Sequence, residues 1–242
     1  MSNYFKYFDD VDYKFGDETD ATIFQDISLM STVIDQVADG TSLYSKYYIL
    51  PDERPDQLSQ KLYGRPDYHW TFYILNPELR EKRWPMSPGR IFTVATEKYP
   101  GKVIPTRTKL TDKFKVGQTI TGQVSEATAT IKERNLDLGL LLLENIDGTF
   151  VADENVNSTN SDGAIEVIVV NSFVEQYNAP HHYINADGDY VDIDPEVGPG
   201  GLLTEKTNLD HLQDLNEANS QIKVFRQDFV TEIVNAFRES LN

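Results

Sequence analysis

Residues 47–76 read "YYILPDERPDQLSQKLYGRPDYHWTFYILN". The opening "YYIL" is apolar and rich in residues that favour strands. An Arg-Pro-Asp triplet follows at 54–56, and it is a helix start signal because proline and acidic residues are favoured in the first turn. The triplet recurs at 65–67. We predict a strand and then two short helices, the first ended by Gly64 and the second by Asn76 and the proline after it.

The composition limits the classes of partner. The 242 residues carry 22 basic and 39 acidic side chains, a net charge of −17. A chain this acidic is a poor ligand for nucleic-acid phosphates. The chain has no cysteine, and no apolar run reaches the roughly 20 residues of a membrane helix. We therefore expect no nucleic-acid partner, no membrane partner, and synthesis in a reducing cytoplasm.

An internal repeat marks residues 105–170, which are rich in threonine and strand-forming residues. The segment that starts at Phe114 matches the one that starts 36 residues later at Phe150. The matched pairs are Phe114 with Phe150, Ile120 with Val156, Ser125 with Ser161, and Ile131 with Val167. Short strands at this spacing favour a small β-barrel or sandwich.

The flanking segments differ from this β region. Residues 1–44 predict an extended, aromatic-rich arm with a turn at Gly16. Residues 171–242 predict a loop, a helix, the short strand "QIKVF" and a final amphipathic helix. The apolar stripe of the final helix comprises Val230, Ile233, Val234, Phe237 and Leu241. Such a terminal helix usually docks on its own core or on a partner.

A metal site was considered at His181 and His182, because aspartates follow at 187, 189, 192 and 194. The spacing does not fit a calcium-binding EF-hand loop. Adjacent histidines on a strand point to opposite faces, so we expect them not to chelate one ion. The preferred interpretation is a polar hairpin with Asp187 and Gly188 at its tip.

The sequence also offers no catalytic motif. It contains no G-x-S-x-G, no P-loop and no G-x-G-x-x-G, and its many acids form carboxylate pairs by chance. We predict no enzymatic activity, no catalytic residues, no cofactor and no metal.

The stretch at 47–76 resembles a LysM module, a β-α-α-β unit whose best-known examples bind N-acetylglucosamine polymers. Two further segments make the resemblance more specific than the LysM module alone. They are the N-terminal "YFKYFDDVDYKFGD" and the C-terminal "LNEANSQIKVFRQDFVTEIVNAF". Together these segments resemble the LysM-bearing baseplate wedge subunits of contractile-tailed bacteriophages, the gene-product-fifty-three family of the T-even type. The resemblance covers roughly residues 1–100 and 172–242, whereas 105–170 departs from it.

The resemblance implies an α+β fold with four parts. They are an N-terminal arm at 1–44, a LysM-like module at 45–104, an inserted β domain at 105–170 and a C-terminal loop with amphipathic helices at 171–242.

The resemblance also implies a structural role in the virion. Such a subunit joins neighbouring wedges, contacts other wedge and inner-baseplate proteins, and closes six copies into a ring. Aromatic residues and arginine are enriched in interface hot spots. We predict partner contacts at Tyr4, Phe5, Tyr7, Phe8, Tyr48, Arg54, Tyr68, Trp70, Phe229, Ile233 and Phe237.

The alternative is a peptidoglycan-binding module that targets a lysin or a virion to the cell wall. Its sugar groove would lie around residues 50–53 and 75–78. We disfavour it because a single LysM unit binds weakly and no hydrolase domain accompanies it.

Overall fold

The computed structural model describes residues 10–14, 16, 22–25 and 43–240. Helices and strands are both present in quantity, which confirms the predicted α+β class. The chain forms two compact units, each with its own core. The split unit combines the described residues up to Ser87 with those from Asn216 onward, and the continuous unit is Pro88–Leu215.

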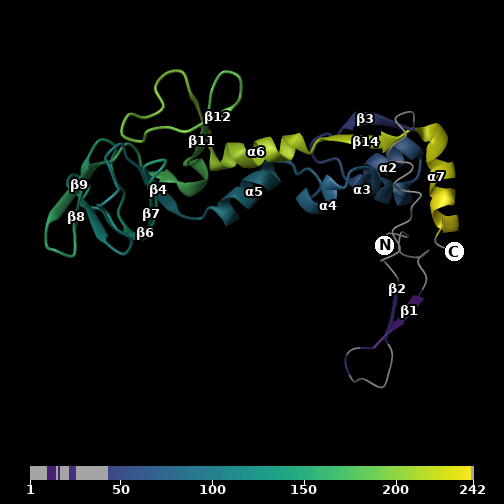
Figure 1. Ribbon diagram of the computed structural model, residues 1–242, viewed down its shortest axis with the longest axis horizontal. Coiled ribbons are helices and arrows are strands. Elements are labelled where there is room, and N and C mark those ends of the chain that lie inside the picture. The colour runs from purple at the N-terminus through teal and green to yellow at the C-terminus, as the bar shows by residue number, and fades with distance from the viewer. Residues whose placement is uncertain (1–9, 15, 17–21, 26–42, 241–242) are drawn as a thin grey trace. The chain divides into compact units, whose positions relative to one another are not determined.

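The split unit is built mainly from short helices around a two-stranded sheet (Figure 1). A separate antiparallel hairpin of β1 and β2, with its turn at Gly16, lies within the segment predicted as an arm. The elements of this unit are β1 (Asp10–Tyr13), β2 (Thr22–Gln25), β3 (Tyr44–Tyr48), α2 (Pro55–Tyr63), η2 (Pro66–Tyr68), α3 (Trp70–Leu75), α4 (Glu78–Lys82), β14 (Gln221–Phe225) and α7 (Gln227–Ser240).

The predicted helix signals act as expected in this unit. Pro55 occupies the first turn of α2, and Gly64 ends that helix with a left-handed φ of 70°. The second Arg-Pro-Asp triplet opens the 3-10 turn η2, and α3 follows it. The helix boundaries around 47–76 are thus fixed by local residue chemistry.

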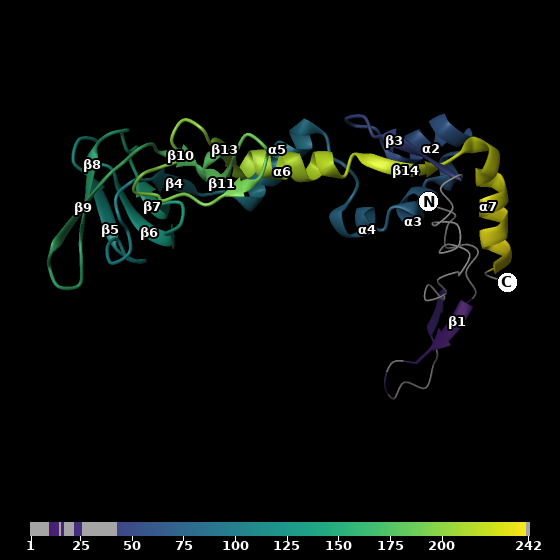
Figure 2. The ribbon, with the colours of Figure 1, turned by 45° about the horizontal axis from the view of Figure 1, so that its top comes forward.

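The sheet of the split unit pairs two distant segments. β3 and β14 run antiparallel, from Tyr44 opposite Phe225 to Tyr48 opposite Gln221, and they lie side by side in Figures 1 and 2. The buried side of β14 contacts α3, and α7 packs against α2. The core consists of Ile49, Leu58, Tyr63, Tyr68, Phe72, Leu75, Leu79, Ile222, Val224, Phe225, Val230 and Val234.

Asn76 attaches the end of α3 to β14. Its Nδ2 donates to the carbonyl oxygens of Phe72, at 2.7 Å, and Lys223, at 2.8 Å. Its Oδ1 accepts from the Lys223 amide at 2.8 Å. The side chain is 1% exposed, so these bonds form away from competing water.

The unit boundaries differ from the predicted ones. We placed a module at 45–104, but the compact split unit ends at Ser87 and resumes at Asn216. The strand that pairs with β3 comes from 221–225, within the predicted C-terminal segment. Helix α5 (Pro88–Lys98) and strand β4 (Lys102–Pro105), which fall largely within the predicted module, belong to the continuous unit.

The continuous unit is mainly β. Its elements are α5 (Pro88–Lys98), β4 (Lys102–Pro105), β5 (Thr119–Gly122), β6 (Thr128–Asn135), β7 (Leu140–Asp147), β8 (Asn155–Thr159), β9 (Ile165–Val169), β10 (Val174–Glu175), η3 (Gln176–Asn178), β11 (Pro180–Ile184), β12 (Tyr190–Val191), β13 (Thr204–Thr207) and most of α6 (Asn208–Ala218). Seven strands form one antiparallel sheet in the order β10-β4-β7-β6-β5-β8-β9. A three-stranded sheet, β12-β11-β13, contains the predicted polar hairpin.

The seven-stranded sheet curls around an apolar core. The Asn171 amide donates to the Pro105 carbonyl at 3.0 Å, and Thr106 Oγ1 donates to the Val169 carbonyl at 2.8 Å. These bonds join the end of β9 to the segment that follows β4. The enclosed side chains include Ile104, Phe114, Ile120, Ile131, Leu141, Phe150, Val156, Ile168 and Val170.

The internal repeat corresponds to two hairpins, β5–β6 and β8–β9. The hairpins meet along β5 and β8, which pair antiparallel with Thr121 opposite Asn157. These two residues occupy equivalent positions in the repeat, so the pairing relates the two copies by an approximate twofold axis. Phe114 and Phe150 are both buried before their hairpins, as the repeat predicts.

One predicted pair in the repeat is wrong. Val167 is exposed, whereas Ile131 is buried. Ile120 faces Ala129 in the first hairpin and Val156 faces Ile168 in the second, so the second turn is three residues longer. The structural counterpart of Ile131 is therefore the buried Val170.

Among the residues described here, no helix is both long enough and apolar enough to cross a bilayer.

Candidate functional site

The predicted interface residues fall into three groups. Tyr4, Phe5, Tyr7 and Phe8 lie outside the described residues. Tyr48 and Arg54 are exposed on the split unit. Tyr48 Oη donates to a carboxylate oxygen of Glu217 at 2.7 Å, and this bond raises the pKa of the phenol. Arg54 forms a two-pronged ion pair with Asp56, with N···O distances of 3.0 and 3.1 Å.

Tyr68 and Phe237 belong to the core of the split unit. Each is 3% exposed. Trp70 is partly buried and packs on Phe237, with ring centroids 4.8 Å apart. The prediction that Tyr68 and Phe237 contact a partner is corrected, because their surfaces are already covered by this chain. Their burial follows from the small size of the unit, which needs its aromatic side chains to build a core.

The C-terminal helix docks on its own unit. Val230, Val234 and Phe237 of α7 are buried. Ile233 is partly buried and packs against the same core, and Phe229 is also partly buried. The helix therefore uses most of its apolar stripe within the chain.

Glu53 organises the loop between β3 and α2. Its carboxylate accepts from Tyr47 Oη at 3.0 Å, from Lys61 Nζ at 3.0 Å and from the Leu50 amide at 3.2 Å. Burial acts to raise the pKa of this carboxyl group, but these donors together lower it below its ordinary value. The Glu53 carbonyl accepts from Trp84 Nε1 at 2.8 Å, and this bond attaches the segment after α4 to the loop.

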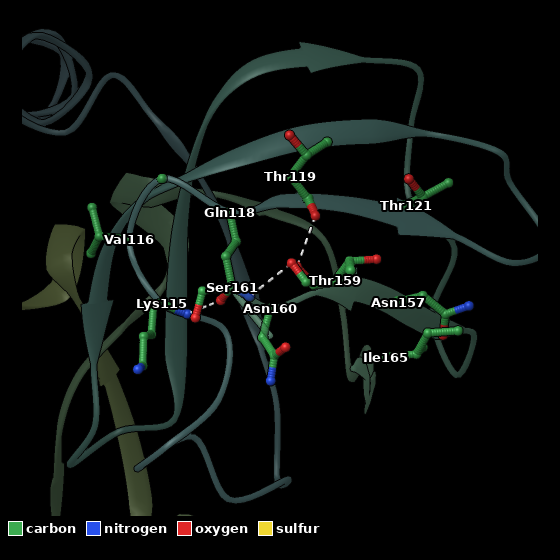
Figure 3. Close-up of a pocket in the computed structure, with 12 residues that line it drawn as sticks. Lys115, Val116, Gln118, Thr119, Thr121, Asn157, Thr159, Asn160, Ser161 and Ile165 are labelled. Atoms are coloured by element: carbon green, nitrogen blue, oxygen red, sulfur yellow. Dashed lines mark hydrogen bonds between the residues drawn. The ribbon is translucent and has the colours of Figure 1, made fainter. Parts of the chain in front are cut away.

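A polar pocket of about 860 Å³ lies over the β5–β8 pair in the continuous unit (Figure 3). Lys115, Gln118, Asn160 and Ser161 gather at one end of the view, and Thr121 lies near the other. The remaining lining residues are Val116, Gly117, Thr119, Asn157, Ser158, Thr159 and Ile165. The lining offers hydroxyl and amide groups and one ammonium group, a surface suited to polar contacts rather than proton transfer.

Gln118 and Glu154 occupy equivalent positions of the repeat and hold the two hairpins together. Gln118 accepts from the Lys115 amide, and its Nε2 donates to the Thr159 carbonyl at 3.2 Å. Glu154 accepts from the Val151 amide at 2.6 Å. Each side chain thus caps its own loop and reaches the hairpin of the other copy.

The carboxylate of Glu154 accepts more hydrogen bonds than the side-chain amide of Gln118 does. It also accepts from the Ser125 amide and hydroxyl, at 3.0 and 2.8 Å, and from the Val124 amide at 3.0 Å. Burial acts to raise its pKa, but these hydrogen bonds lower it below the ordinary 4.5. The side chain occupies the space where Gly122 lacks a Cβ, since a methyl group there would lie 2.7 Å from Glu154 Oε2.

Three histidines meet in the continuous unit. Candidate ligand atoms of His181, His182 and His211 all lie within 4.8 Å of one another. Burial, and then repulsion by the other two histidines, lowers the pKa of His181 to about 4. Burial, and then His211, also lowers the pKa of His182. The rings of His181 and His182 are therefore neutral at pH 7.

The argument that His181 and His182 point apart is wrong. A bulge interrupts the β11–β13 register between Pro180 and His182, so strict alternation fails at His181. Both rings then lie together, with Nδ1 atoms 2.8 Å apart. The sequence analysis also missed His211, which comes from a different element and carries no local signal that links it to this pair.

A comparison of the chain with protein-family models and with curated proteins finds no match.

Proposed function

We propose that this protein is a structural subunit of a bacteriophage contractile-tail baseplate wedge. In this role, it joins neighbouring wedges and contacts inner-baseplate proteins, and it performs no catalysis. The split unit is a LysM-like β-α-α-β module whose second strand is β14, and the continuous unit is inserted between its helices and that strand.

The pairing of β3 with β14 carries this proposal. The resemblance to the wedge subunits rests on an N-terminal stretch at 4–17 and on two further stretches, 47–76 and 215–237. Nearly all of both lies in the split unit, where they share one sheet and one core. The β region at 105–170, which departs from the resemblance, lies in the other unit.

Two contacts favour assembly over glycan binding. The loop at 50–53 would form one side of the sugar groove, and Trp84 of this chain is bonded to it through Glu53. The segment at 75–78 would form the other side, and there Asn76 is fully engaged by Lys223 and Phe72. The Glu53 carbonyl and the Asn76 side-chain amide are thus already paired within the chain.

The proposal is tested on the native particle. Chemical cross-linking and quantitative mass spectrometry identify the proteins that accompany the chain and their ratios, and a sedimentation assay measures its retention on insoluble peptidoglycan. Several virion proteins in fixed ratio, without retention on peptidoglycan, would support the wedge role. Retention on peptidoglycan without protein partners would overturn it in favour of a cell-wall-binding module.

A single exposed residue sharpens this test. Arg54→Ala removes a guanidinium whose partner among the described residues is the neighbouring Asp56 at the surface. We expect fewer assembled wedges with folding unchanged. Arg90→Ala, at an exposed position of α5 in the continuous unit, is the matched control. If Arg54→Ala assembled into wedges as well as wild type does, Arg54 would not be a partner contact.

A further inference from the structure

The three histidines come from two elements of the continuous unit that are close in space. His181 and His182 lie on β11, and His211 lies in the first turns of α6. The rings of His181 and His211 stack, with centroids 3.9 Å apart and planes 11° apart. The ring of His182 stands nearly perpendicular to both, at 85°. The candidate ligand nitrogens of the three rings lie within 4.8 Å of one another.

The separations between candidate ligand nitrogens are close to those expected around one ion. Imidazole nitrogens lie about 2.0–2.1 Å from a tetrahedral zinc ion, which places two ligand nitrogens about 3.3 Å apart. The Nδ1 atoms of His181 and His182 are 2.8 Å apart. One candidate ligand nitrogen from each of the three histidines lies within 4.8 Å of the other two. The lone pair of an imidazole nitrogen lies in the ring plane, and the stacked planes of His181 and His211 do not converge on one ion, so binding requires one of these two rings to rotate out of the stack.

Neighbouring side chains hold the cluster in place. Tyr190 stacks on His182 with centroids 4.0 Å apart and planes 14° apart. The nearby positive charge of Lys206 is paired with Asp214, at an N···O distance of 2.8 Å. The cluster is therefore positioned by packing, and the charge of Lys206 is paired with that of Asp214.

The cluster is accessible. His181 and His182 line a pocket of about 530 Å³, together with Tyr190, Asp192 and residues 135–138. All three histidines are partly buried rather than enclosed. An ion can enter, and the pocket leaves a coordination position for water or another ligand.

We propose that His181, His182 and His211 bind one divalent first-row transition metal ion, such as Zn²⁺, which links β11 to α6. Three imidazole ligands suit zinc, nickel, copper or cobalt, whereas calcium and magnesium prefer oxygen ligands. The aspartates at 187, 189, 192 and 194 are not part of the ligand group. The ion joins β11 to α6, which are separated in the sequence, and it stabilises the continuous unit when bound.

The test uses the full chain without a polyhistidine tag. Zn²⁺ binding is measured by isothermal titration calorimetry, and Co²⁺ is used as a spectroscopic probe whose visible absorption reports nitrogen coordination. We expect one Zn²⁺ per chain, a Co²⁺ spectrum that is lost on addition of excess Zn²⁺, and a higher melting temperature with Zn²⁺ than with Mg²⁺.

The variants separate ligation from packing. His211→Phe keeps an aromatic ring to stack on His181 but removes the ligand nitrogen. We expect at least about a tenfold loss of Zn²⁺ affinity, since even residues that only orient metal ligands contribute 10–100-fold. His182→Gln should weaken binding similarly. His69→Ala, which changes the chain's remaining histidine, is the matched control and should bind as wild type does.

Two results would overturn the site. One is Zn²⁺ binding by His211→Phe that equals wild type, which would place any bound metal elsewhere. The other is the absence of saturable binding by the wild-type chain, which would leave the histidines as an aromatic packing cluster. Circular dichroism of each variant shows that a loss of affinity is not a loss of fold.

Discussion

The two units reach a folded core by different routes. The continuous unit includes several pairs of strands that are neighbours in sequence, such as β5 with β6, β6 with β7 and β8 with β9. In the split unit, apart from the β1–β2 hairpin, the sheet pairs β3 with β14, which lie far apart in the sequence. Closing a long loop costs entropy before the contact is made, so the split unit depends more on a few non-local contacts.

The largest expected effect comes from a charge placed in either core. Ile222→Asp puts a carboxylate into β14 at a position that is 2% exposed. Burying an unpaired charge costs several kcal/mol, comparable with the whole stability of a small unit. We expect amide hydrogen exchange to rise throughout the split unit while β5 and β8 stay protected.

The reciprocal variant is Ile120→Asp in β5, where the side chain is fully buried. It should expose the amides of the seven-stranded sheet and leave β3 and β14 protected. Equal loss of protection in both units with either variant would show that they unfold as one, and it would break the comparison.

The next largest loss of stability is expected at Asn76, which attaches the end of α3 to β14. Asn76→Ala removes three hydrogen bonds and leaves the amide and carbonyl of Lys223 without these partners. At about 1 kcal/mol for each bond, we expect about 3 kcal/mol of destabilisation. Denaturant unfolding with hydrogen-exchange readout on β14 measures it. An unchanged midpoint would mean that β3 alone holds β14.

A comparable but smaller effect is expected at Glu154 in the continuous unit. Glu154→Gln installs the residue that the first copy of the repeat has at position 118, yet it loses charge-assisted bonds from three backbone amides. Hydrogen bonds to charged groups contribute about 1.5–3 kcal/mol, so we expect about 2 kcal/mol of destabilisation at pH 7.

The pH dependence gives Glu154 a second signature. Because folding lowers its pKa, the carboxylate adds stability above the ordinary value of 4.5, and this stability is lost as pH falls through the lower folded value. The difference in unfolding free energy between wild type and Glu154→Gln should therefore shrink as pH falls below 4.5. If this difference in unfolding free energy stayed constant down to pH 2, the substitution would act through packing rather than through loss of the Glu154 charge.

The smallest effect on stability is expected at Arg54. Its ion pair with Asp56 is exposed, with side-chain exposures of 70% and 42%. Exposed pairs contribute little, so Arg54→Ala should change the unfolding free energy by less than about 0.5 kcal/mol. Thermal unfolding measures this. A larger loss would show that the residue supports the start of α2, and another exposed position would then be needed for the assembly test.

The sequence alone determined the local elements. Proline and acidic residues at 54–56, and glycine at position 64, fix the ends of α2 because they act on the backbone next to them. The apolar spacing of 230–237 determined the buried stripe of α7. The repeat from Phe114 and Phe150 determined two similar hairpins, since each hairpin is encoded within a short segment.

Only the tertiary structure decided which distant segments meet. The sequence "QIKVF" of β14 does not by itself specify β3 as its partner, because strand pairing depends on the other elements that cover both strands. The bulge at His181 depends on the register with β13, and the approach of His211 depends on how α6 packs. Periodicity is a property of neighbours in sequence, whereas pairing, register and the meeting of side chains are properties of the folded core.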